Sequence, residues 1–166
     1  MNRQKMKILV VEDGTGDTKL IQKDLKRGGK FTLVHGMSLQ TTLRHLSAGN
    51  IDAVLLNLSF PESLGLEILV QIHKFDVAIP IIVLTRFFEE TECLKALKLG
   101  AQDYFPLSLL DVSGLAEALF YLCECHRFGI VPKRSYFATK LEQAPRVVRG
   151  LERRLARPAE GPKEKP

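Results

Sequence analysis

The sequence predicts an α/β fold in which five parallel strands form a doubly wound sheet in the order 2-1-3-4-5. Two observations support this prediction. Short apolar runs rich in β-branched residues alternate with stretches whose apolar residues recur at helical spacing, as expected for successive βα units. Several of these runs are apolar throughout rather than at every second position, which is typical of strands buried on both faces of a parallel sheet.

The predicted strands and helices alternate along the first 127 residues. The predicted strands are the apolar runs at residues 7–11, 31–34, 53–56, 81–84 and 104–105. After each run, residues that are mostly apolar recur at helical spacing, and this pattern predicts one amphipathic helix after each strand. These series are Leu20, Ile21 and Leu25; Leu39, Leu43 and Leu46; Leu66, Leu69, Val70 and His73; Leu94, Leu97 and Lys98; and Leu115, Leu119 and Leu122.

Composition limits the class of protein. The 166 residues are 45% hydrophobic and 26% charged, which is typical of a soluble globular chain with one ordinary domain and an appendage. No apolar run approaches the roughly 18 residues that span a bilayer, and the first strand-like run is too short for a secretory signal. We therefore expect a cytoplasmic protein without a membrane span. Cys93, Cys123 and Cys125 lack metal-binding spacing and are expected to be reduced thiols.

Polar residues follow the predicted strands and indicate where the function lies. Glu12 and Asp13 follow the first strand, Asn57 the third and Thr85 the fourth, while Leu107 lies in the loop after the fifth. In a doubly wound sheet the carboxyl ends of the strands form the functional crevice. We therefore expect these five side chains to meet at one edge of the sheet.

Four blocks of sequence carry a specific resemblance. They are VVEDGTGDTKLI, LLNLSFPESLGLEIL, PIIVLT and GAQDYFPLSLLD, in this order. Together they resemble the receiver domain of two-component response regulators over residues 6–127. The resemblance implies a flavodoxin-like fold and a pocket in which an acidic pair holds magnesium and an aspartate accepts a phosphoryl group. A threonine or serine contacts that group in the family, and a lysine pairs with its charge.

The chain matches the family's pocket only in part. Matching residues are Glu12 and Asp13 for the acidic pair, Thr85 for the hydroxyl, Tyr104 for the switching aromatic, and Pro61 and Gly65 for the neighbouring loop. Asn57, however, stands at the phosphoacceptor position and Leu107 at that of the lysine. An amide oxygen is too weak a nucleophile to form an acyl phosphate, which needs a carboxylate. The resemblance therefore implies a degenerate pseudo-receiver.

Arg86 is the third departure, because the family usually keeps a small residue after the threonine. Its guanidinium could pair with Asp13 or Glu12 and close the pocket without phosphate, or it could point into solvent. We expect no dedicated metal site or cofactor, although oxygens of Glu12, Asp13 and Asn57 could bind magnesium weakly. Nearby, Phe87, Phe88 and Tyr104 are expected to form the face that switches and binds partners. One of the two phenylalanines is expected to pack into the core.

The net positive charge of the chain lies in its C-terminal part. From residue 126 onward there are eleven Lys and Arg against four Glu. We predict a receiver-like domain over 1–127, a linker over 128–140, a basic amphipathic helix over 141–157 and a disordered tail over 158–166. The basic residues of the predicted helix are Arg146, Arg149, Arg153, Arg154 and Arg157. This helix could fold onto the receiver, mediate self-association, meet an acidic protein or a membrane surface, or touch nucleic acid, which is a minority interpretation. The alternative without a partner is a solvated charged face.

These observations favour a non-enzymatic, phosphorylation-independent interaction module of a two-component signalling pathway or phosphorelay. The implied partner is a signalling protein, such as a histidine kinase or an output protein, and self-association is a further alternative. A second hypothesis is a conventional phosphoacceptor regulator whose aspartate has been replaced at Asn57. A third is a regulator that binds nucleic acid through the basic tail.

Overall fold

A computed structural model of the chain describes residues 4–14, 16, 18–58, 64–108 and 112–132. All of these residues lie in one compact unit, Met1–Lys133. The predicted basic helix over 141–157, with its five arginines, and the predicted tail over 158–166 lie outside the described residues, as does the predicted linker beyond residue 132. In the described part of the chain, no helix has both the length and the apolar character needed to cross a membrane.

Strands and helices alternate as the sequence predicts. In chain order they are β1 (Met6–Val11), α1 (Lys19–Arg27), β2 (Phe31–Gly36), α2 (Leu39–Ala48), β3 (Ala53–Asn57), α3 (Leu64–Phe75), β4 (Ile81–Thr85), α4 (Glu90–Lys98), β5 (Asp103–Pro106) and α5 (Val112–Arg127). The strands form one parallel sheet in the order β2-β1-β3-β4-β5, so the predicted fold class is confirmed. The predicted strand at residues 104–105 extends by one residue at each end.

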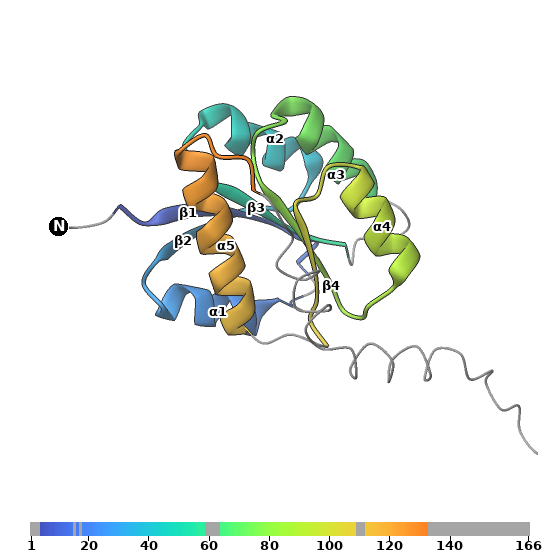
Figure 1. The fold of residues 1–166 in the computed structure, drawn as a ribbon, viewed down its shortest axis with the longest axis horizontal. Helices are drawn as coiled ribbons and strands as arrows, with labels where there is room; N and C mark the ends of the chain where they lie inside the picture. The colour runs from blue at the N-terminus through green and yellow to red at the C-terminus, as the bar shows by residue number, and fades with distance from the viewer. Residues whose placement is uncertain (1–3, 15, 17, 59–63, 109–111, 133–166) are drawn as a thin grey trace, which may run out of the picture. The chain divides into compact units, whose positions relative to one another are not determined.

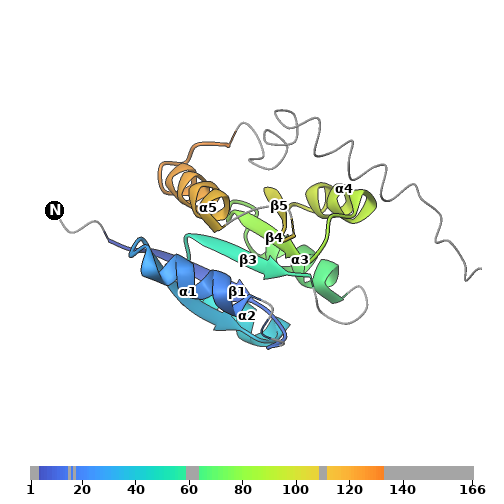
Figure 2. The ribbon, with the colours of Figure 1, turned by 90° about the horizontal axis from the view of Figure 1, so that it is seen from below.

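Helices cover both faces of the sheet, which explains the apolar composition of the central strands. Helix α1 packs beside α5, and α2 packs beside α3 (Figures 1 and 2). Every residue of β3 and β4 is buried between these layers. Strands enclosed in this way need apolar side chains at every position rather than at alternate positions.

In two of the helices, an apolar residue of the predicted inward-facing series is exposed in the structure. Leu20 is 78% exposed, while Gln22 and Leu25 of the same helix are buried. In α4, Leu94 is half exposed and its neighbour Cys93 is buried instead. Apolar spacing alone does not determine which side of a short helix faces the sheet, because a polar side chain with a buried partner can take an inward position.

The three cysteines are buried free thiols in the structure. Burial, together with the nearby Asp103 carboxylate, raises the pKa of Cys93 to about 11. Burial likewise raises the pKa of Cys123 to about 12. Because the thiolate is the reactive form, these two cysteines belong to the packed core rather than to a nucleophilic or metal-binding site.

Candidate functional site

The predicted site residues meet at the carboxyl edge of the sheet. The parallel register pairs Val11 with Leu56 and Asn57 with Leu84. Glu12 and Asp13 therefore follow β1 beside the end of β3, and Thr85 ends the adjacent strand β4. The backbone N–H of Leu107 donates to the Thr85 carbonyl oxygen at 2.8 Å, which brings the loop after β5 to the same edge.

Glu12 is buried, and its carboxylate is held by one residue just before α1 and one within α1. Its carboxylate accepts hydrogen bonds from the Thr18 hydroxyl and, at 2.9 Å, from the Gln22 amide. The same Gln22 nitrogen also lies 2.9 Å from the Thr18 hydroxyl oxygen. On the other side, Nδ1 of His35 lies 3.9 Å from Oε1 of Glu12, so this imidazole forms an ion pair when it is protonated. Glu12 thus anchors the start of α1 to the end of β1.

Thr18, Gln22 and His35 are absent from the set of site residues predicted from the sequence. A signal for the first two was present, because residues 18 and 22 are four positions apart and lie on one side of a helical turn. Two polar side chains at that spacing, next to a buried acidic residue, suit a hydrogen-bonded cluster. His35 comes from β2, and only the strand order brings it near Glu12.

Asn57 is the last residue of β3 and is only 2% exposed. It lies where a carboxylate would have to accept a phosphoryl group, and its amide cannot form an acyl phosphate. Leu107 is half-buried in the loop after β5 and provides no positive charge at the position of the family's lysine. The nucleophile and the cation are therefore both absent from the positions that the resemblance assigns to them.

The acidic side chains fit a magnesium ion poorly. Glu12 already accepts two hydrogen bonds through its two oxygens, and Asn57 contributes a neutral amide in place of a carboxylate. Asp13, half-buried, is the remaining carboxylate of the predicted set. Among the residues that the structure describes, no three His, Cys, Asp or Glu side chains are grouped so that they could hold a metal ion.

Arg86 is exposed and begins the loop between β4 and α4. Its backbone carbonyl accepts a hydrogen bond from the N–H of Ser108, so the loops after β4 and β5 are joined. Glu12 takes its hydrogen bonds from Thr18 and Gln22, which makes Asp13 the remaining candidate for pairing with the Arg86 guanidinium. The Arg86–Asp13 pair stays a prediction.

Thr85 and Tyr104 are tied to the loop before α4 and to α4 itself. The buried Thr85 hydroxyl donates to the Phe87 carbonyl oxygen at 2.9 Å. The phenol of Tyr104, which is fully buried, donates to Oε1 of Glu92 on α4 at 3.0 Å. Burial raises the pKa of Tyr104, and the Glu92 carboxylate raises it further. Tyr104 therefore occupies an inward position that joins β5 to α4.

The two phenylalanines of this loop have different environments. The ring of Phe88 meets that of Tyr104 edge to face, with centroids 6.3 Å apart and an interplanar angle of 82°. Phe87 is 67% exposed. Phe88 is therefore the inward-facing member of the pair, although it is half-buried rather than part of the core, and Phe87 lies at the surface. Pro61 of the predicted loop lies outside the described residues, whereas Gly65 is buried in α3.

Comparisons with known proteins agree with this geometry. Residues 8–108 match the family model described as the response regulator receiver domain. The chain is 30% identical over 115 residues to the alkaline phosphatase synthesis transcriptional regulatory protein PhoP of Bacillus subtilis, covering 68% of this chain and 48% of that protein. It is 33% identical over 119 residues to the transcriptional regulatory protein ZraR of Salmonella typhimurium, covering 72% of this chain and 26% of that one. The chain thus spans about half or less of these curated relatives.

Solved structures show the same fold at lower sequence identity. A CheY-like response regulator receiver domain protein from Methanospirillum hungatei superposes with a TM-score of 0.65 at 18% identity, covering 76% of this chain and 99% of that one. At that identity the similarity supports the fold alone. The family model and the curated relatives carry the assignment further: this chain belongs to the response regulator receiver family of two-component signalling.

Proposed function

We propose that this chain is a phosphorylation-independent interaction module built on a receiver domain. The observation that carries the proposal is the buried amide of Asn57 at the carboxyl end of β3, where phosphoryl transfer requires a carboxylate. A receiver without an acceptor cannot use its phosphorylation state as a signal. Such a domain would act through the surface to which a partner protein binds.

Three neighbouring features support the same conclusion. Leu107 supplies no cation to stabilise the charge of a transferred phosphoryl group. The Thr85 hydroxyl is already hydrogen-bonded to the Phe87 carbonyl oxygen. Tyr104 is buried against Phe88 and Glu92. Because the proposed module accepts no phosphoryl group that could favour one of two states, we expect the face formed by α4, β5 and α5 to hold one dominant conformation.

The proposed module has no catalytic activity of its own. A signalling protein, such as a histidine kinase or an output protein, is the expected partner, and the exposed Phe87 is a suitable anchor because aromatic side chains are enriched at interface centres. Phe87 precedes Phe88, whose ring contacts Tyr104, so the loop before α4 is the first candidate for a partner surface. Phe87→Ser should weaken partner binding without unfolding the domain.

A phosphorylation assay tests the proposal directly. The protein is incubated with acetyl phosphate and magnesium, and its intact mass is measured, with a conventional receiver treated in parallel as the control for the reagent. We expect no added phosphoryl group on this chain. A mass increase of one phosphoryl group that maps to the carboxyl edge of the sheet would contradict the proposal.

Two other functions have specific support. If Asn57 replaces a natural aspartate, the chain is a conventional phosphoacceptor regulator, and the sequence of the native coding region at this position decides the matter. The curated relatives are named transcriptional regulators, and residues 133–166 are rich in Lys and Arg, which favours nucleic-acid binding through this region as a further candidate. Salt-dependent binding to duplex DNA would support that candidate.

A further inference from the structure

A hollow lies at the amino-terminal edge of the sheet, opposite the edge that carries Asn57. It has a volume of about 410 Å³ and forms where β1 begins, where the chain enters β2 and where α5 ends. The lining residues used below are Lys5, Lys30, Phe120, Glu124, Arg127 and Phe128. Neither the resemblance nor the proposed function assigns a role to this edge.

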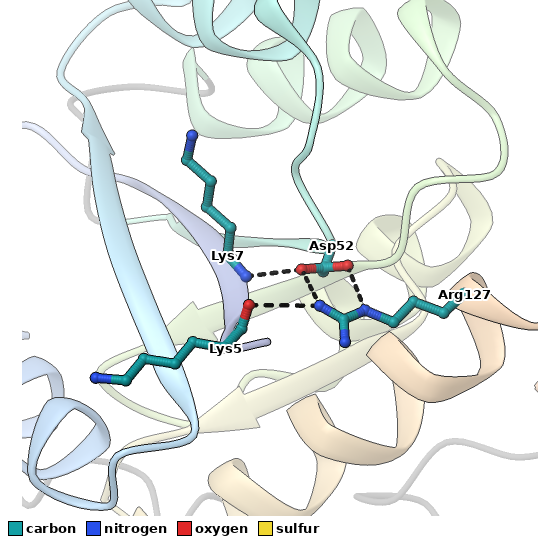
Figure 3. Close-up of polar contacts among 4 residues, drawn as sticks. All are labelled: Lys5, Lys7, Asp52 and Arg127. Atoms are coloured by element: carbon teal, nitrogen blue, oxygen red, sulfur yellow. Dashed lines mark hydrogen bonds and ion pairs between the residues drawn. The ribbon is translucent and has the colours of Figure 1, made fainter. Parts of the chain in front are cut away.

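The charge in the hollow is predominantly positive. Lys5, Lys30 and Arg127 line it, and Glu124 is the acidic residue of the lining. The Arg127 guanidinium is held by the Asp52 carboxylate through two hydrogen bonds, so its charge is largely compensated (Figure 3). Lys5 and Lys30 therefore remain as the cations that an incoming group would meet.

The hollow also presents apolar surface. The Lys30 ammonium lies 5.0 Å from the centre of the Phe120 ring, which places a cation and an aromatic face together. Phe128, directly after α5, is 72% exposed, and Ile130 and Val131 are also exposed. A single exposed apolar side chain is ordinary, but three within four residues beside a hollow indicate a contact surface.

These features distinguish between classes of ligand. A phosphate group favours an arginine fork or a set of backbone N–H donors, and the Arg127 fork is already bound to Asp52. Lysine ammonium groups bind carboxylates and phosphates alike as point charges, but the exposed apolar side chains of Phe128, Ile130 and Val131 favour a peptide, whose own side chains can cover them. The chain's own residues 133–166 carry ten Lys and Arg against four Glu, so their charge has the same sign as that of the hollow.

We propose that this hollow binds a short acidic segment of a partner protein. Carboxylates of the segment contact Lys5 and Lys30, and an aromatic or aliphatic side chain packs between Phe120 and Phe128. The surface is separate from the pocket around Asn57. Binding here therefore does not depend on whether residue 57 accepts a phosphoryl group, and the phosphorylation assay tests a different claim.

The test uses the full-length, ¹⁵N-labelled chain and a synthetic probe peptide of Glu and Asp residues around a central Phe. In a titration followed by NMR, we expect amide shifts at Lys5, Lys30 and Phe128 and none at Asn57. Lys30→Glu and Phe128→Ser should each weaken binding by roughly fivefold or more. Lys98→Glu, an equal charge change on the exposed surface of α4, should alter it less than about twofold.

A peptide with Ser in place of the central Phe should bind several times more weakly than the probe. Lys30→Gln gives the milder version of the charge change and repeats the test if the reversal lowers stability. Equal effects of Lys30→Glu and Lys98→Glu would mean that net charge rather than the hollow binds the peptide, and would overturn the proposal. The proposal would also be overturned if these amides shifted with anionic lipid vesicles but not with the peptide. The same holds if they shifted when only the protein concentration was raised.

Discussion

Arg127 forms a two-point ion pair with Asp52 (Figure 3). Arg127 is the last residue of α5, and Asp52 lies 75 positions earlier in the chain, just before β3. Nε and Nη2 of Arg127 donate to the two carboxylate oxygens at 2.8 and 2.9 Å. The backbone N–H of Lys7 donates to the same carboxylate at 2.7 Å, and Nη2 also donates to the Lys5 carbonyl oxygen. One carboxylate thus joins the start of β1, the entry to β3 and the end of α5.

Removing the guanidinium should destabilise the fold. Arg127→Ala is expected to lower the free energy of unfolding by about 1–2 kcal/mol, because it removes two charge-assisted hydrogen bonds and leaves Asp52 with fewer donors. Urea denaturation measures the change. The matched control is Arg27→Ala, whose guanidinium lies 3.8 Å from Asp24 at the exposed end of α1, and which should cost less than about 0.5 kcal/mol. Equal costs for the two variants would contradict this prediction.

The same ion pair should make stability depend on pH. Burial alone would raise the pKa of Asp52, but the hydrogen bonds from Arg127 and the Lys7 backbone outweigh it, so the folded-state pKa is lowered. The unfolded chain therefore takes up the proton first as the pH falls. The contribution is present above the ordinary aspartate pKa of about 4 and is lost as the pH falls through the lower, folded value. Between pH 6 and 3, the wild-type chain should lose more stability than Asp52→Asn, and parallel curves would refute the assignment.

Tyr104 should ionise late in the folded protein. Burial and the Glu92 carboxylate disfavour its phenolate, so its pKa is raised above the ordinary value near 10. The difference in absorbance at 295 nm between wild type and Tyr104→Phe should appear only above the range in which a solvated phenol titrates. The matching contribution to stability is present below pH 10 and is lost as the pH rises beyond it. Titration of Tyr104 in the ordinary range would show that the phenol is not enclosed.

Restoring the acceptor alone should not restore efficient phosphorylation. Asn57→Asp supplies the carboxylate, but Leu107 leaves the developing charge without its cation. We expect slow labelling by acetyl phosphate in the single variant, and labelling at least about tenfold faster when Leu107→Lys is added. Intact-mass time courses compare the two. If the single variant labels as fast as the double variant, then Leu107 matters less than the proposal holds.

Arg86→Ala tests whether the guanidinium neutralises the acidic pair. Because Arg86 is exposed, the variant should change the free energy of unfolding by less than about 1 kcal/mol. If Arg86 pairs with Asp13, removing it should also increase the affinity for magnesium, since the carboxylate then lacks a competing cation. Magnesium titration followed by NMR at the Asp13 amide measures this. An unchanged affinity would leave Arg86 as a solvated side chain.

The sequence by itself determined the architecture and the chemical character of the carboxyl edge. Continuous apolar runs require burial on both faces, and parallel strands joined by helices bring the residues after each strand to one edge. Glu12, Asn57, Thr85 and Leu107 could therefore be placed together without coordinates. The identities of Asn57 and Leu107 also show directly that the carboxylate and the lysine are missing, since this depends only on which side chains are present.

The tertiary structure alone decided which side chains pair. Gln22 faces inward and Leu20 outward because the buried Glu12 carboxylate needs donors, and that need depends on how α1 lies against the sheet. Arg127 and Asp52 meet across 75 positions, where no local spacing links them. The hollow beside Lys30 likewise forms from three separate segments. The spacing of apolar residues along the sequence indicates which side of a single helix or strand faces the core. Contacts between distant elements depend on how those elements pack, which only the folded chain defines.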